Sequence, residues 1–149
     1  MLYFFIIFSI IFIDFFMKKW VIHKIPIHTK IEIVKNRIYL WHIKNKGVAY
    51  NRLARYPRLI IFLIVSAIAG LIFWLVKLCR NSGEQNLKLA FSFLIGGAIA
   101  NLIDRVKHEG VTDFIYIKSK FTPIFNIADV FILIGGIFCI LAGIFTKEN

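Results

Sequence analysis

Four aspartates stand out in a chain that is otherwise strongly apolar. They are Asp14, Asp104, Asp113 and Asp129, and the last two have no basic residue within four positions. If two such carboxylates are in contact they share one proton, because like charges at short range cannot both ionise. The anion can then take a proton from an attacking water while its protonated partner donates to an amide carbonyl. This chemistry needs no metal or cofactor, and His108 does not complete a metal-ligand set beside Asp113.

The other two aspartates have a base close by in the sequence. Lys18 follows Asp14 by four residues, a favourable spacing on a helix for an acid followed by a base. Arg105 directly follows Asp104, and Asn101 lies one helical turn earlier. These patterns favour ion pairs and hydrogen-bond anchors over reacting groups.

The composition indicates a membrane protein with one domain. Of the 149 residues 59% are hydrophobic and 18% charged, whereas a soluble domain is about half apolar and a quarter charged. A bundle embedded in a bilayer is therefore expected. The net charge of +11 then indicates basic loops beside lipid headgroups, so membrane lipids rather than nucleic acids are the expected partners. Cys79 and Cys139 are expected to be free thiols.

Four apolar runs predict an all-α membrane bundle of four transmembrane helices. The runs cover about residues 1–16, 59–78, 87–104 and 124–146 of a single domain, 1–149. The uncharged part of the third run, Leu89–Ile103, is short for a full crossing, so Lys88 and the polar turn that follows must lie at the membrane interfaces.

The connections between the helices differ in character. The 17–58 segment is too long and too polar for a turn. Residues 28–43 within it alternate between apolar and polar, which predicts a small β-sheet, over about 28–51, on the membrane surface. Segments 77–88 and 105–123 are predicted as a turn and a loop, the latter holding Asp113. With four spans, both termini and 77–88 share one side. All four aspartates then lie at the opposite edge, where ionisable residues are usually functional.

Five short motifs, in order, resemble the lipoprotein signal peptidase (signal peptidase II) family. The resemblance covers nearly the whole chain and includes the plan of four spans. The motifs are Asp14 with Lys18, NKGVAYN at Asn45–Asn51, GGAIANLIDR at Gly96–Arg105, VTDF at Val111–Phe114 and FNIAD at Phe125–Asp129.

The resemblance implies an aspartic endopeptidase that needs no metal or cofactor. Its expected substrate is a bacterial prolipoprotein, cut just before a cysteine that carries a diacylglyceryl group, and sensitivity to cyclic peptides such as globomycin is expected. Carried over by position, the catalytic aspartates are Asp113 and Asp129. The implied substrate-binding or supporting residues are Asp14, Lys18, Asn45, Gly47, Asn101, Asp104, Arg105 and Asn126.

The resemblance also implies a location and an orientation. We expect a monomeric, multi-pass protein of the bacterial cytoplasmic (inner) membrane, with the active site and the small sheet on the extracytoplasmic side and both termini in the cytoplasm. The distribution of basic residues conflicts with this orientation. The 17–58 segment holds eleven Lys and Arg residues and the 77–88 segment only three, which would place the long loop in the cytoplasm. We give the five ordered motifs more weight than this count.

Three positions depart from the family pattern. Phe15 stands where the family usually has Gln, Tyr50 where it has Phe, and Ala100 where it often has Gly. None of them touches the predicted catalytic pair. Phe15 removes a polar side chain near the membrane edge, which leaves the role of that position open.

The supporting residues have plausible physical roles. Asn101, Asn126 and Arg105 are expected to donate hydrogen bonds to the substrate backbone or to orient a catalytic acid. Arg105 is expected to be held by Asp104 or another acid.

Two other functions remain open at this point. A small ion- or proton-coupled transporter also uses intramembrane acids, but it favours acids near mid-span and inverted repeats, and neither is visible here. A lipid-anchoring scaffold would leave Asp113 and Asp129 without a purpose.

Overall fold

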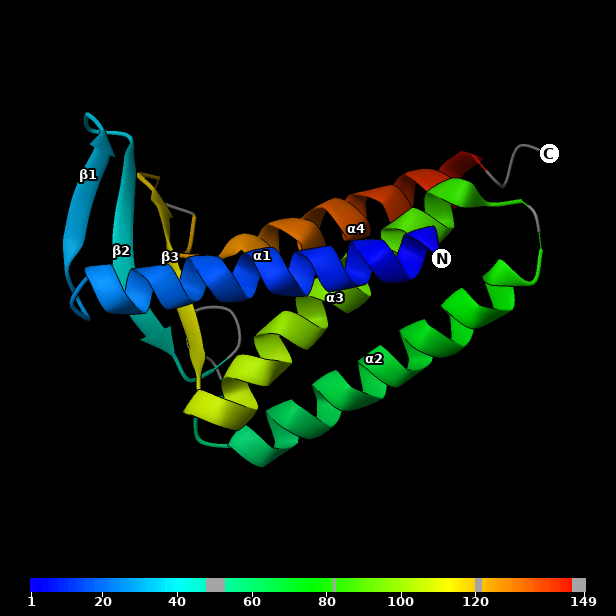
Figure 1. The fold of residues 1–149 in the computed structure, drawn as a ribbon, viewed down its shortest axis with the longest axis horizontal. Coiled ribbons are helices and arrows are strands. Elements are labelled where there is room, and N and C mark those ends of the chain that lie inside the picture. The colour runs from blue at the N-terminus through cyan, green and yellow to red at the C-terminus, as the bar shows by residue number, and fades with distance from the viewer. Residues whose placement is uncertain (48–52, 82, 120–121, 146–149) are drawn as a thin grey trace.

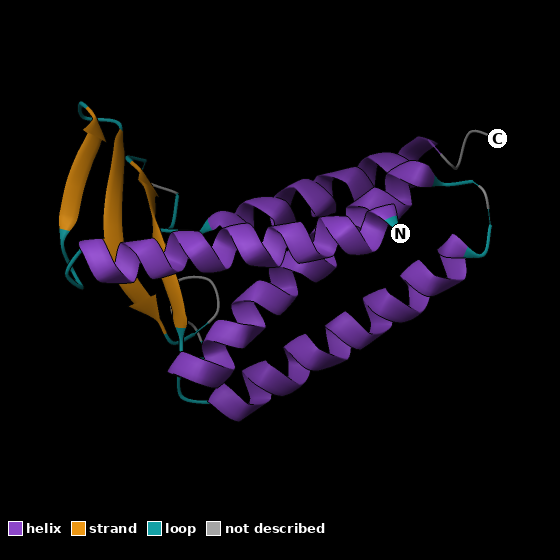
Figure 2. Ribbon diagram, in the orientation of Figure 1, coloured by secondary structure: helices purple, strands orange, loops and turns teal. Residues whose placement is uncertain are grey.

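Four long helices and one small antiparallel sheet make up the computed structural model, which describes residues 1–47, 53–81, 83–119 and 122–145 (Figures 1 and 2). The helices run along the molecule, with the sheet at one end and the N-terminus at the other (Figure 1). The predicted helical bundle with a small sheet is confirmed. In chain order the elements are α1 (Leu2–Lys24), β1 (Lys30–Val34), β2 (Ile38–Asn45), α2 (Pro57–Cys79), α3 (Gln85–His108), β3 (Val111–Ile117) and α4 (Ile127–Phe145).

The helices present an apolar surface to their surroundings. By length and composition, α2 and α3 can cross a membrane, and α4 has a shorter apolar stretch, Ile127–Ala142. Large apolar side chains such as Phe8 on α1 and Phe62 on α2 are exposed. Apolar surface of this extent fits lipid rather than water.

The first helix is longer than predicted. The apolar run ends near residue 16, but α1 continues to Lys24. The charged residues do not end it, because Asp14 and Lys18 are 1% and 3% exposed and their carboxylate and ammonium groups lie 2.6 Å apart. Asp14 is therefore in the middle of a helix rather than near its exit.

The third helix, α3, packs against each of the other three. Glycines allow its closest approach, to α4: a Cβ on Gly97 would lie 2.5 Å from the carbonyl oxygen of Ala128, and one on Gly135 would lie 2.8 Å from that of Ala90. Small residues let helix backbones approach in this way.

We predict that Gly97→Ala lowers the free energy of unfolding by about 1–3 kcal/mol, because the added methyl group forces α3 and α4 apart. Gly136 on α4 is the matched control, since a Cβ there meets nothing within 4 Å. Thermal unfolding in detergent should show a lower midpoint for Gly97→Ala and no loss for Gly136→Ala. Equal midpoints for the two variants would contradict the close approach.

The sheet has a third strand that the sequence analysis missed. Its order is β1-β2-β3, with both pairs antiparallel, and β3 comes from the 105–123 segment that was predicted as a loop. The sequence of β3, VTDFIYI, is rich in β-branched and aromatic residues, which favour strands. The sheet packs on the end of α1 through Val21, Ile25 and Phe114. Asp113 therefore stands on a strand anchored to the bundle.

Candidate active site

Asn126 links the two unpaired aspartates, one through its side chain and the other through its backbone. Asp113 lies on β3 and is 4% exposed, and Asp129 lies in the first turn of α4. Asn126 donates through Nδ2 to Asp113 Oδ1 at 2.8 Å and through its backbone N–H to Asp129 Oδ2 at 3.2 Å. A strand and a helix from different parts of the fold thus meet at one residue.

Local sequence places Asn126 and Asp129 together. Asn126 directly precedes α4, and its Oδ1 accepts a hydrogen bond from the backbone N–H of Asp129 at 3.0 Å. With the return bond from the Asn126 N–H to the Asp129 carboxylate, this is a reciprocal capping box at a helix start. The same interaction that begins the helix therefore orients one of the carboxylates.

The end of β2 approaches the other carboxylate. Asn45 donates through Nδ2 to Asp113 Oδ2 at 3.1 Å, and its Oδ1 accepts the Gly47 backbone N–H at 3.0 Å. Both oxygens of Asp113 are thus held by side-chain amides. The remainder of the Asn45–Asn51 motif, including Tyr50, lies outside the described residues.

Asn101 on α3 connects the site to the interior of the bundle. Its Nδ2 donates to Asp129 Oδ1 at 2.8 Å. Its Oδ1 accepts from Lys18 Nζ at 3.0 Å and from Asn126 Nδ2 at 3.1 Å. A lysine ammonium can only donate, so the oxygen of the Asn101 amide must face Lys18 and its nitrogen must face Asp129.

Lys18 joins the two structural aspartates. Its ammonium lies 2.6 Å from Asp14 Oδ2 and 3.1 Å from Asp104 Oδ2. Each acid also caps a backbone N–H: Asp14 accepts from Ala128 at 2.9 Å and Asp104 from Thr112 at 3.2 Å. These contacts tie α1 to the start of α4 and α3 to β3.

Arg105 is placed differently from the prediction. Lys18, rather than Arg105, lies within ion-pair distance of Asp104. The guanidinium instead donates to two backbone carbonyls, Gly47 O at 2.9 Å and Asn101 O at 3.3 Å. Its role in the structure is to hold the end of β2 against α3. The side-chain direction decides this, because adjacent residues on a helix point to different faces.

Burial raises the pKa of Asp113. Removal from water raises the pKa of Asp113 to about 7, with a further rise from the neighbouring charge of Asp129 and an opposing effect from the amides of Asn45 and Asn126. Asp113 therefore holds its proton well above the pH at which an ordinary carboxyl loses it. Among the described residues, the ion pairs found are those of Lys18, so neither Asp113 nor Asp129 is neutralised by a direct cation.

The network of hydrogen bonds and ion pairs brings together all the predicted catalytic and supporting residues. It includes two donors that sequence reasoning missed, the backbone N–H groups of Thr112 and Ala128. The Asn-x-x-Asp spacing before α4 was a detectable capping pattern. No comparable pattern indicates which backbone N–H would meet a carboxylate from α1 or α3.

Known proteins are similar to this chain in sequence and in fold. The family described as Signal peptidase (SPase) II matches residues 6–145. A lipoprotein signal peptidase of Wigglesworthia glossinidia brevipalpis is 39% identical over 87% of this chain and 86% of its own length. One of Clostridioides difficile (strain 630) is 33% identical over 100% and 99%. A solved structure of a bacterial membrane enzyme superposes with a TM-score of 0.91 at 26% identity, covering 99% of this chain and 90% of the other.

These likenesses, with the fold, place the chain among the peptidases of bacterial membranes. The chain belongs to the signal peptidase II family.

Proposed function

We propose that Asp113 and Asp129 are the catalytic pair of this peptidase and act on the lipid-modified prolipoprotein as a proton-sharing dyad. The observation that carries the proposal is the bridge formed by Asn126, whose side-chain amide donates to the Asp113 carboxylate and whose backbone N–H donates to the Asp129 carboxylate. The raised pKa of Asp113 supports its role as the protonated member. Asp129 is then the anion.

In the proposed reaction a water molecule attacks the scissile amide carbon. Asp129 takes a proton from that water as the new C–O bond forms, and Asp113 gives its proton to the carbonyl oxygen. In the resulting diol, the C–N bond breaks as the leaving nitrogen takes a proton from Asp129 and Asp113 takes one back from a hydroxyl group. The products are a carboxylic acid and an amine, and the dyad returns to one proton. Asn45 and Asn126 hold the carboxyl of Asp113 in place throughout.

Family membership makes this chain a peptidase that processes bacterial prolipoproteins. We propose that the cut lies just before the diacylglyceryl-modified cysteine, because apolar helix faces let a lipidated substrate reach the site from the bilayer. Purified protein should cleave a diacylglyceryl-modified prolipoprotein and leave the unmodified precursor largely intact. Equal cleavage of both would contradict a requirement for the lipid.

We place the protein in the inner membrane as a monomer with four spans and with bound lipids. The sheet and dyad lie on the extracytoplasmic side, the termini lie in the cytoplasm, and a cyclic peptide such as globomycin would occupy the dyad. The buried pairing of Asp14 with Lys18 supports α1 as a span despite its charges. A reporter fused at the C-terminus is expected to report a cytoplasmic location. Extracytoplasmic activity would reverse the orientation.

A transporter finds no support. Asp104, Asp113 and Asp129 lie near the end of α3, on β3 and in the first turn of α4. These parts of the chain meet at the end of the bundle that carries the sheet (Figure 1), whereas a coupled transporter needs acids reachable from both faces.

The pH dependence follows from the raised pKa of Asp113. Because the reaction needs Asp113 protonated, kcat/KM is expected to fall as the pH rises through about 7. The native state also binds this proton more tightly than the unfolded chain does. Proton binding at Asp113 therefore stabilises the fold fully below the ordinary carboxyl pKa of 3.8, and this stabilisation is lost as the pH rises through about 7. Measuring the cleavage rate between about pH 5 and pH 9 tests this. A flat profile would mean that Asp113 is not the acid.

A further inference from the structure

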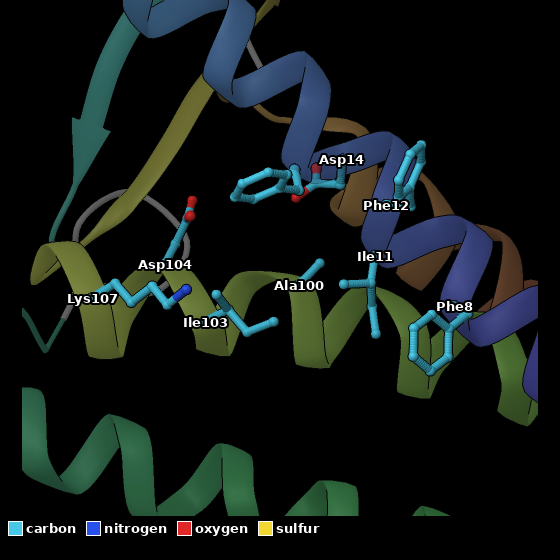
Figure 3. A pocket seen from close by; sticks show the side chains of 9 residues that line it. Phe8, Ile11, Phe12, Asp14, Ala100, Ile103, Asp104 and Lys107 are labelled. Atoms are coloured by element: carbon cyan, nitrogen blue, oxygen red, sulfur yellow. The ribbon is translucent and has the colours of Figure 1, made fainter.

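A groove between α1 and α3 lies beside the carboxylate network and has no part in the proposed reaction. Its volume is about 190 Å³, and it is open on one side. Figure 3 shows Phe8 and Ile11 of α1 pointing toward α3 across it. The walls are mostly apolar, and polar groups lie at one end. The lining residues are Phe8, Ile11, Phe12, Asp14, Phe15, Ala100, Ile103, Asp104 and Lys107.

The polar end of the groove holds one cation and one carboxylate oxygen that have no partner among the described residues. No described residue lies within ion-pair distance of the exposed Lys107, since the ion pairs found are those of Lys18. Asp104 uses Oδ2 for Lys18 and for the Thr112 N–H, which leaves Oδ1 without a donor among the described residues. Asp14 has both oxygens occupied, by Lys18 and Ala128.

The positions of these groups match the parts of a phospholipid. Lys107 lies in the last turn of α3, at the end that carries the sheet, and the phenylalanines continue along α1 away from that end (Figure 3). An acyl chain in the groove would therefore run along the helices while its phosphate meets Lys107. Basic residues between membrane helices bind lipid headgroups in this way.

We propose that this groove binds one phospholipid molecule as a structural ligand, with an acyl chain against Phe8, Ile11 and Phe15 and the phosphate on Lys107. The Oδ1 atom of Asp104 accepts a hydrogen bond from the headgroup, which can come from the ammonium of phosphatidylethanolamine or a hydroxyl of phosphatidylglycerol. The inference rests on the proposed membrane position of α1 and α3. It does not depend on the assignment of the dyad.

The groove also gives Phe15 a role. Its side chain lines the groove. An aromatic ring there extends the apolar wall up to the charged end, whereas an amide would face the acyl chain without a partner. The bound lipid would cover the outer side of Asp104, whose other oxygen holds Lys18.

The test is binding of single lipids to the delipidated, full-length protein in detergent, measured by native mass spectrometry. Phosphatidylethanolamine, phosphatidylglycerol and diacylglycerol are titrated separately. Lys107→Gln is expected to raise Kd for both phospholipids about fivefold, since one such contact contributes about 1 kcal/mol. Phe15→Gln is expected to raise Kd by a similar factor, through the acyl chain.

Two variants control for charge and apolar surface elsewhere. Lys19 is an exposed base on α1, and Phe62 an exposed ring on α2, and neither lines the groove. Lys19→Gln and Phe62→Gln are expected to bind phospholipid as the wild type does. If they lose as much affinity as the groove variants, the lipid is only annular and the proposal is wrong. Diacylglycerol binding as tight as phospholipid binding, unaffected by Lys107→Gln, would overturn it in favour of the lipidated substrate. Because none of these measurements uses cleavage, failure here is distinct from failure of the proposed function.

Discussion

Asp113→Asn and Asp129→Asn are each expected to reduce cleavage of a diacylglyceryl-modified prolipoprotein by about 10³-fold or more. An amide can neither take a proton from water nor supply one to the carbonyl oxygen, and positioned acids and bases contribute about 10²–10⁴-fold each. The exchange changes the size of the side chain little. Each variant keeps one oxygen to accept part of the hydrogen bonds from Asn101, Asn45 and Asn126. The measurement is kcat at saturating substrate, in detergent or lipid.

Glu32→Gln is the control for loss of a carboxylate. Glu32 is exposed on β1, far from the network in the sheet order, and its Oε1 accepts the Asn36 N–H, a bond that Gln can keep. Its activity should equal that of wild type. If either aspartate variant unfolds at the wild-type temperature and still cleaves within about tenfold of the wild-type rate, the pair is misassigned, because the proposed step has no other base.

Lys18→Met is expected to lower the free energy of unfolding by about 3–5 kcal/mol, the usual cost of leaving a buried charge without its partner. Lys18 is the ion-pair partner of both Asp14 and Asp104 and is 3% exposed. Its loss also removes a hydrogen bond to the side-chain oxygen of Asn101. Because the nitrogen of the same amide holds Asp129, cleavage should fall as well. Thermal unfolding in detergent and the cleavage assay measure the two effects.

Lys19→Met is the matched control, because Lys19 is the next residue on α1 and is exposed. We expect its stability and activity to be close to those of wild type. An Asp14→Asn/Lys18→Met double variant should lose less stability than the two single changes added together, since it removes both charges of one pair. Strict additivity would show that the two groups do not interact in the folded protein.

The helices were largely predictable because apolar runs are long and continuous. The predicted runs 59–78 and 87–104 fall within α2 and α3. The length of α1 was not predictable from hydropathy, since a charged residue looks like an exit unless its buried partner is known. Asp14 and Lys18 have the spacing of a pair, but only the fold shows that both are inside.

The candidate site was predictable in its residue types and not in its geometry. The motifs selected Asn45, Asn101 and Asn126 correctly as parts of one cluster. The partner predicted for Arg105 was wrong, because Asp104 forms its ion pair with Lys18 on α1. Packing over the whole bundle decides which helix lies against each face of α3. The separation of residues along the sequence carries little information about this packing. The strand β3 could have been found, since VTDFIYI has strand composition.

The hydrogen bond between Asp14 and Ala128 bears on when the proposed dyad can first form. The N–H of Ala128, at the start of α4, is capped by the carboxylate of Asp14, 114 residues earlier. During synthesis α1 is made long before α4, so Asp113 has no Asp129 beside it until the start of α4 has been made. A ribosome-bound chain that stops before residue 129 lacks one of the two proposed catalytic carboxylates. We therefore expect a nascent chain to be unable to cleave its substrate until α4 has docked against α1 and α3.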